Sequence, residues 1–126
     1  MDDITPGQVW ICPPLGAAPP LLCVVGRVDT LTKPTTPPSA TRVISLSVTP
    51  ALAARDAGWP TIAHLPIEAE AFRASTLTLT EHVTQPGPAF AEGYATWWAK
   101  AGQGRAGAFA IPLAEAYLGV ASTARK

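Results

Sequence analysis

Proline is the feature that most limits how this chain can fold. The 126 residues include 14 prolines and 10 glycines, about twice the usual frequency of this pair. Proline fixes φ and lacks a backbone N–H group, so it is excluded from helix interiors and central strands. Because prolines occur along most of the chain, we expect many short strands and helices joined by stiff turns.

Five segments in the first two-thirds of the chain are predicted to be short β-strands, because they are rich in β-branched and aromatic residues or alternate apolar with polar side chains. These segments are 8–12, 21–29, 41–49, 61–65 and 76–83. Gly26 lies where the alternation of the second segment changes, which predicts a bulge or a sharp bend. Residues 30–40 contain three prolines and are expected to form an exposed loop.

Two short helices are predicted between these strands. Residues 51–57 have high helix propensity, with Pro50 suited to the first helical position and Thr49 to the cap. A second short helix is expected to begin at Pro66 and run through residue 75, with acidic side chains near its start.

The last third of the chain has helical periodicity. Large apolar side chains and one alanine recur on one helix face at residues 90, 94, 97, 98 and 101. Trp97 and Trp98 would project about 100° apart, so we expect one to pack on the sheet and the other to lie at its margin. A glycine-rich turn, a short strand over 108–111 and a final helix that begins at Pro112 follow.

These elements predict a single domain over residues 1–126, mainly β with some α. Its length is typical of one domain, and 48% of its residues are hydrophobic, enough for a core. We expect a barrel-like core over 4–83 and a helical extension over 89–120 that packs on it.

Charge and cysteine content narrow the classes of partner. Nine Lys and Arg residues balance nine Asp and Glu residues, so there is no basic stripe for nucleic acid. No segment has the roughly 18 apolar residues of a membrane helix. The acidic start Met1-Asp2-Asp3 lacks the positive charge of a signal peptide. We therefore expect a cytoplasmic protein in which Cys12 and Cys23 are reduced.

Residues with metal-binding or catalytic chemistry are few. His64 and His82, the only histidines, form no metal-site spacing with Cys12 and Cys23. Residues 102–107 match the pattern G-x-G-x-x-G, but a predicted helix precedes them and a strand follows, the reverse of a dinucleotide site. We expect a tight turn there, and no metal, cofactor or catalytic group.

The opening Pro6-Gly7-Gln8-Val9-Trp10 and the strands at 21–28 and 42–49 resemble the small SH3-like barrels of bacteria. The same layout, which continues into His64-Leu65-Pro66-Ile67, is similar to that of the MazF/PemK-type toxin endoribonucleases over roughly residues 4–82. This resemblance implies an SH3-like β-barrel of about five short strands, followed by a C-terminal helical segment.

In that toxin family, the catalytic pair is an arginine after the first loop and a Ser or Thr at the end of the third strand. Thr49 occupies a position that resembles the second of these. Residues 13–20 contain no arginine, and the arginines that remain for the role are Arg27 and Arg42.

The sequence is therefore compatible with two functions. The first is a small cytosolic binding module that acts through a protein partner, with an immunity or regulatory protein of a bacterial toxin system as one analogous instance. Its expected contact residues are Trp59 and His64, beside a stiff proline-containing loop, with Arg42 at the rim. The sequence is also compatible with association of the chain with itself. The alternative is a metal-independent endoribonuclease of the toxin type.

Overall fold

The computed structural model describes residues 4–14, 16–33, 39–75, 77–102 and 107–124. Its secondary structure is β1 (Gln8–Cys12), β2 (Leu21–Lys33), β3 (Ser39–Pro50), α1 (Leu52–Asp56), β4 (Ile62–Glu68), α2 (Ala69–Ala74), β5 (Thr78–Val83), α3 (Pro88–Gly102) and α4 (Leu113–Ala124). The strands form one antiparallel sheet in the order β4-β3-β2-β1-β5. This confirms the predicted combination of five strands and a C-terminal helical segment. Within the described residues, the end strands β4 and β5 do not pair with each other.

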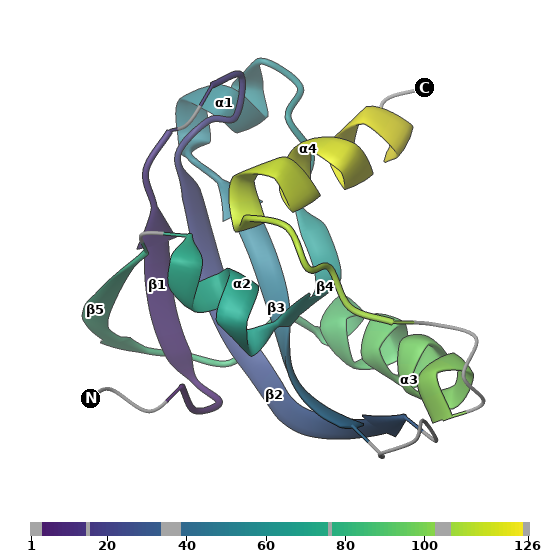
Figure 1. Ribbon diagram of the computed structural model, residues 1–126. Coiled ribbons are helices and arrows are strands. Elements are labelled where there is room, and N and C mark those ends of the chain that lie inside the picture. The colour runs from purple at the N-terminus through teal and green to yellow at the C-terminus, as the bar shows by residue number, and fades with distance from the viewer. Residues whose placement is uncertain (1–3, 15, 34–38, 76, 103–106, 125–126) are drawn as a thin grey trace.

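One face of the sheet carries the main core. The strands alternate, so that Ile44, Leu46 and Val48 of β3 all point to this face and are fully buried. Helices α2 and α4 lie over the same face (Figure 1). Phe72 of α2 meets Trp10 of β1 edge to face, with ring centroids 5.3 Å apart. The core therefore lies between this face and these two helices.

Helix α3 covers part of the opposite face, over β4 and β2. There Val43 and Ser45 of β3 are also fully buried. Two glycines allow this close approach. A Cβ atom on Gly26 would overlap the ring of Phe90, and one on Gly93 would lie 2.9 Å from Cβ of His64. The β2–β3 register shifts at Gly26, which confirms the bulge predicted there.

The prediction of an exposed loop over residues 30–40 was largely wrong. Strand β2 continues to Lys33 and β3 begins at Ser39, with Thr30 opposite Arg42 in the ladder. Threonine favours extended structure, and the three prolines of this segment all lie at 34–38, outside the described residues. The outcome is a long, curved β2–β3 hairpin (Figure 1).

Two prolines that were expected to begin helices lie in strands instead. Pro66 belongs to β4, and its carbonyl accepts a hydrogen bond of 3.0 Å from the N–H of Phe109. An edge strand tolerates a residue without an N–H group, so α2 begins only at Ala69. Pro50 ends β3, and α1 begins after Ala51, without a side-chain cap. Thr49 is therefore a strand residue, not a cap.

The C-terminal third follows its predicted pattern closely. Phe90 and Trp97 are buried, whereas Trp98 is 42% exposed, which confirms that one tryptophan packs and its neighbour lies at the margin. The strand expected over 108–111 is a single parallel bridge between Phe109 and Ile67. Helix α4 extends beyond residue 120, to Ala124. Most of the glycine-rich turn, 103–106, lies outside the described residues.

Both cysteines are buried and free, as expected. Burial raises the pKa of each thiol, that of Cys23 strongly. At neutral pH both are therefore protonated and poor nucleophiles. No helix in the described segments is long and apolar enough to cross a membrane.

Candidate functional site

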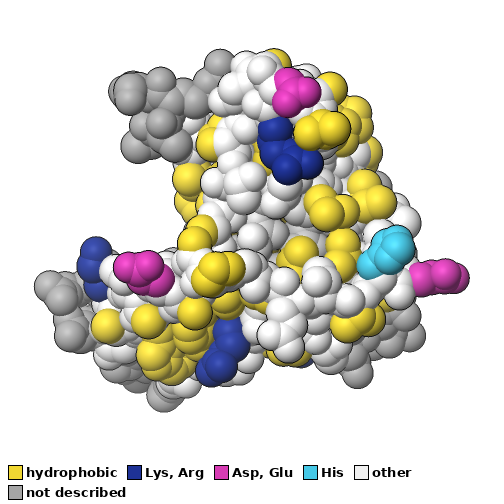
Figure 2. Space-filling view, turned by 180° about the vertical axis from the view of Figure 1, so that it is seen from behind, with side chains coloured by type: hydrophobic (Ala, Val, Ile, Leu, Met, Phe, Trp, Pro, Cys, Tyr) yellow, Lys and Arg dark blue, Asp and Glu magenta, His cyan; other side chains and the backbone are white. Residues whose placement is uncertain are grey.

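An open groove of about 670 Å³ lies between α3 and β4, and we call it the α3–β4 groove. Its lining consists of Ile62, Ala63, His64, Ala89, Glu92, Gly93, Thr96, Trp97 and Lys100. Seen from behind, the surface is deeply hollowed on the side of α3 that faces α4 (Figure 2). The groove therefore opens into a wider concave surface with one helix on each side.

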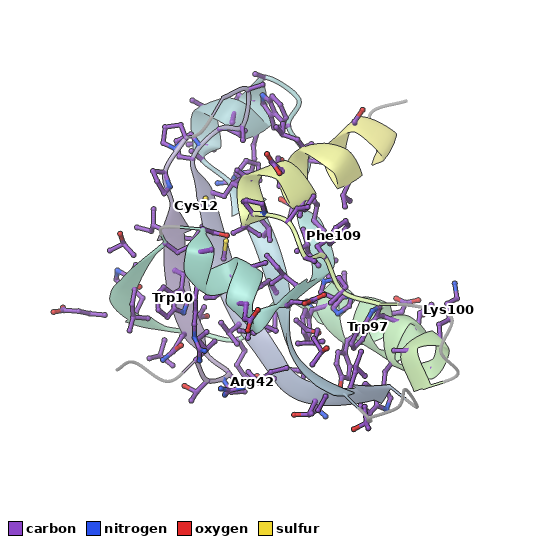
Figure 3. All side chains as sticks on the ribbon, in the orientation of Figure 1. Trp10, Cys12, Arg42, Trp97, Lys100 and Phe109 are labelled. Carbon is purple, nitrogen blue, oxygen red and sulfur yellow. The ribbon has the colours of Figure 1, made fainter. Side chains whose placement is uncertain are left out.

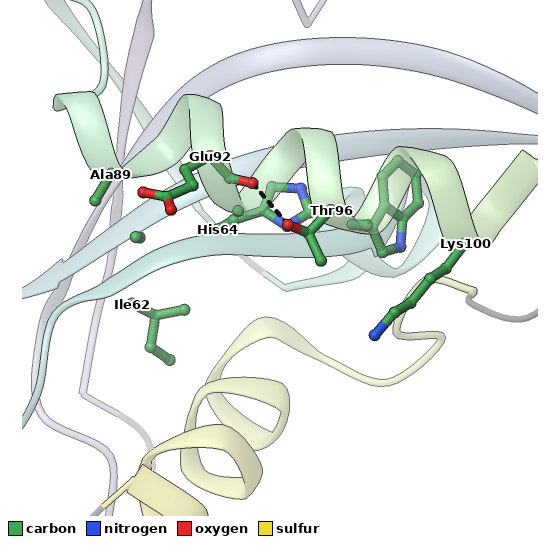
Figure 4. A pocket seen from close by; sticks show the side chains of 9 residues that line it. Ile62, His64, Ala89, Glu92, Thr96 and Lys100 are labelled. Atoms are coloured by element: carbon green, nitrogen blue, oxygen red, sulfur yellow. Dashed lines mark hydrogen bonds between the residues drawn. The ribbon is translucent and has the colours of Figure 1, made fainter.

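Two large apolar side chains lie in the floor of the groove, and its rim is charged. Ile62 is 7% exposed and Trp97 8% exposed, and both contribute to the floor. Glu92 and Lys100 lie on the rim, eight residues apart on α3, which corresponds to about 12 Å along a helix. Ile62 and Lys100 both point toward the space between α3 and α4 (Figure 4). The hydroxyl of Thr96 donates to the carbonyl of Glu92 at 3.1 Å.

His64 lies on β4 underneath α3 and is surrounded by aromatic rings. Its ring centroid is 5.5 Å from those of Phe90 and Trp97 and 5.8 Å from that of Tyr94. Its Nε2 is 3.0 Å from Oγ of Ser45. Burial lowers the pKa of His64 to about 4, so the imidazole is neutral at pH 7. The side chain therefore joins α3 to the sheet as an uncharged group.

The pairing of Ser45 with His64 resembles the nucleophile and base of a hydrolase. However, Ser45 is 0% exposed, since it lies on β3 under α3. A substrate carbonyl could not approach its Oγ without displacement of the helix. The pair is therefore best explained as a satisfied buried hydrogen bond.

Tyr94 is the centre of the aromatic cluster on α3. Its ring stacks on those of Phe90 and Trp98, at interplanar angles of 15° and 14°. The guanidinium of Arg27 lies 4.9 Å from its ring centroid, and its hydroxyl donates to Asp29 at 2.9 Å. Burial, and then the hydrogen bond to Asp29, raise the pKa of Tyr94. These contacts attach the outer side of α3 to β2.

The three contact residues expected from the sequence lie in different surroundings. Trp59 is partly buried beside α4, and its ring centroid is 6.1 Å from that of Tyr117. His64 lies under α3 on the opposite face of the sheet. Arg42 is exposed, and its Nη2 donates to the carbonyl of Ile4 at 3.5 Å. It lies well away from Trp97 and Lys100 (Figure 3). Only His64 belongs to the α3–β4 groove.

The arginines considered for an endoribonuclease pair are both engaged elsewhere. Arg27 covers Tyr94, and Arg42 reaches toward the N-terminal segment. Thr49 is seven residues from Arg42 on the same strand, which corresponds to about 23 Å in extended chain. Neither guanidinium is beside the threonine hydroxyl.

The polar side of the groove was not predicted from the sequence. Glu92, Thr96 and Lys100 recur every four residues, so they share one face of α3. This spacing is visible in the sequence, directly beside the aromatic stripe that was predicted to pack on the sheet.

Comparisons of the chain with protein-family models, with curated proteins and with solved structures found no match. The shape and charge of the groove are therefore the features that point to a function.

Proposed function

We propose that this protein is a non-catalytic, cytosolic binding module that recognises another protein through the α3–β4 groove. The observation that carries the proposal is the combination of an apolar floor with opposite charges at the rim, on an open concave surface. Protein interfaces typically have an apolar centre and a polar rim, and tryptophan is enriched among their strongest contacts. Trp97 in the floor and Trp98 nearby supply such side chains.

The chemistry of His64 supports a binding role over a catalytic one. A general base needs access to its substrate and a pKa near the working pH. Here the imidazole is hydrogen-bonded to Ser45 and packed under α3, with its pKa lowered to about 4. Its contacts stabilise the position of the helix that forms one side of the groove.

Metal-independent RNA cleavage has less support. It requires a cation at the reacting phosphate and a basic surface for the RNA backbone. Arg27 and Arg42 are not beside Thr49, and the chain has no net charge. An SH3-like relationship, with a role as an immunity or regulatory protein of a bacterial toxin system, is one form that a binding module can take.

Capture of partners from the native cell extract tests the proposal. Thr96→Arg places a long charged side chain in the groove. Ala95→Arg is the matched control, because Ala95 is also exposed on α3 but does not line the groove. Wild type and Ala95→Arg should retain the same proteins, and Thr96→Arg should lose them. Equal capture by all three would contradict the proposal. RNA cleavage that Thr49→Ala abolishes would instead support the endoribonuclease.

A further inference from the structure

The edge of β4 is poorly suited to accept another strand. Its pairing with β3 shifts register, because Leu46 lies opposite Leu65 but Val48 lies opposite Ile62. One extra residue is therefore accommodated in β4, and such a bulge distorts an edge. Farther along, the chain's own Phe109 already pairs with this edge. A partner that binds by strand addition would find little regular edge available.

The space beside the edge has the form of a trough between two helices. Residues of α3 and β4 line the groove, with Ile62 at its base, and the ribbon of α4 lies across from α3 (Figure 4). Grooves of this kind in other proteins bind amphipathic helices, which insert an apolar face between the walls. The trough therefore suits a helix better than an extended peptide.

The two rim charges specify a direction for such a helix. Glu92 lies in the first half of α3, and Lys100 lies in its last turn. A helix antiparallel to α3 would begin beside Lys100 and end beside Glu92. Acidic residues are favoured in the first turn of a helix and basic residues in the last. The same residues would meet opposite charges on the rim.

We propose that the occupant is an amphipathic helix of a partner protein that lies antiparallel to α3, with acidic residues in its first turn beside Lys100 and basic residues in its last turn beside Glu92. This inference rests on the proposed function and adds the form, direction and charge pattern of the partner.

A second copy of this chain is a less suitable occupant. Helix α3 already buries Phe90 and Trp97 on its own sheet, and α4 already buries Leu113 and Tyr117. In its described part α4 carries Glu115 in its first turn but no basic residue in its last. These helices could not offer an apolar face to a neighbouring molecule without leaving their own core.

Two displayed libraries of 18-residue helical peptides, randomised along one face, provide the test. One library has two Glu residues in the first turn and two Lys residues in the last, and the other has these ends exchanged. Selection on the intact protein, after removal of peptides that bind Thr96→Arg, should enrich the first library only. Enrichment of both libraries equally, or of the exchanged library, would overturn the proposal.

Affinity of the selected peptides for charge variants then tests the direction. Lys100→Glu should weaken binding about two- to fivefold, as expected for an exposed charge pair, and replacement of the peptide's first-turn Glu residues by Lys should restore it. Arg55→Glu, on exposed α1, is the control and should have no effect. An equal effect of both variants would overturn the assigned direction.

The two proposals fail in distinguishable ways. If neither library yields binders while Thr96→Arg still abolishes capture from the cell extract, the helical partner is wrong and the groove remains the binding site. Self-association that Thr96→Arg disrupts would identify a second copy as the occupant and overturn the inference. If capture does not depend on the groove, both proposals are wrong.

Discussion

Adjacent tryptophans on α3 should contribute very differently to stability. Trp97 is 8% exposed, packs against His64, and donates its indole N–H to the carbonyl of Gly107 at 2.9 Å. Trp98 is 42% exposed and stacks on Tyr94. The two side chains have the same size, so Trp97→Ala and Trp98→Ala differ mainly in the environment that each change removes.

The size of each effect follows from this environment. Deletion of a buried tryptophan side chain costs about 3–5 kcal/mol. The lost hydrogen bond should add little for Trp97→Ala, because Gly107 is exposed and its carbonyl can bind water. Trp98→Ala should cost at least about 0.5–1.5 kcal/mol, because an aromatic pair contributes this much beyond the area that it buries. An exposed side chain without such a stacking partner would cost less than about 0.5 kcal/mol, so the stacking on Tyr94 accounts for the larger value.

Urea unfolding followed by circular dichroism at 222 nm would measure both values. Fluorescence is unsuitable, since each substitution removes a fluorophore. A domain of this size has a total stability of about 5–15 kcal/mol, so the transition of Trp97→Ala should move to much lower urea at an unchanged slope. Trp97→Phe serves as a control and should fall between wild type and alanine. Equal losses below about 1 kcal/mol at both positions would refute the docking of α3 on the sheet.

Three further predictions follow from the contacts of the sheet. Because burial lowers the pKa of His64 to about 4, from about 6.5 in unfolded chains, the unfolded state binds more protons between these values. The free energy of unfolding should therefore decrease as pH falls from about 6.5 to 4. Urea titrations should show a smaller decrease for His64→Phe than for wild type, and the same decrease in both proteins would contradict the lowered pKa of His64. Gly26→Val should lower the melting temperature because its side chain would overlap α3, whereas Gly87→Ala, which meets no atom within 4 Å, should change it little. Without reductant, thiol titration should find the two thiols of Cys12 and Cys23 reactive only after the protein is denatured. Rapid reaction of these thiols in the native protein would show that they are not buried.

Local sequence patterns predicted much of the fold. The bulge at Gly26 and the buried stripe of α3 followed from alternation and helical spacing, because both depend on neighbouring residues. The predictions failed where distant residues decide the outcome. Pro66 lies in a strand because β4 pairs with β3, in which Ser45 lies opposite Pro66, and because the N–H of Phe109 bonds to its carbonyl. Thr30 continues β2 because β3 returns beside it.

The candidate site was less predictable for the same reason. The position of His64 beside a proline-containing loop predicts a contact residue, but its role depends on Ser45 and on helix α3, which starts more than twenty residues later. The proline-containing loop around Trp59 also predicts a contact residue, yet this side chain packs beside Tyr117. No spacing rule joins such residues, since the fold alone brings them together. Glu92 and Lys100, by contrast, were accessible to a helical pattern search.

Site-specific photocrosslinking in the native cell extract tests the central claim most directly. A benzoylphenylalanine residue would replace either Ala89, an exposed residue that lines the α3–β4 groove at the start of α3, or Glu81, exposed on β5. If the groove binds a partner protein, irradiation should give a discrete heavier adduct with the probe at Ala89 and none with the probe at Glu81. A discrete adduct at Glu81 alone, or no adduct at either position, would contradict the claim.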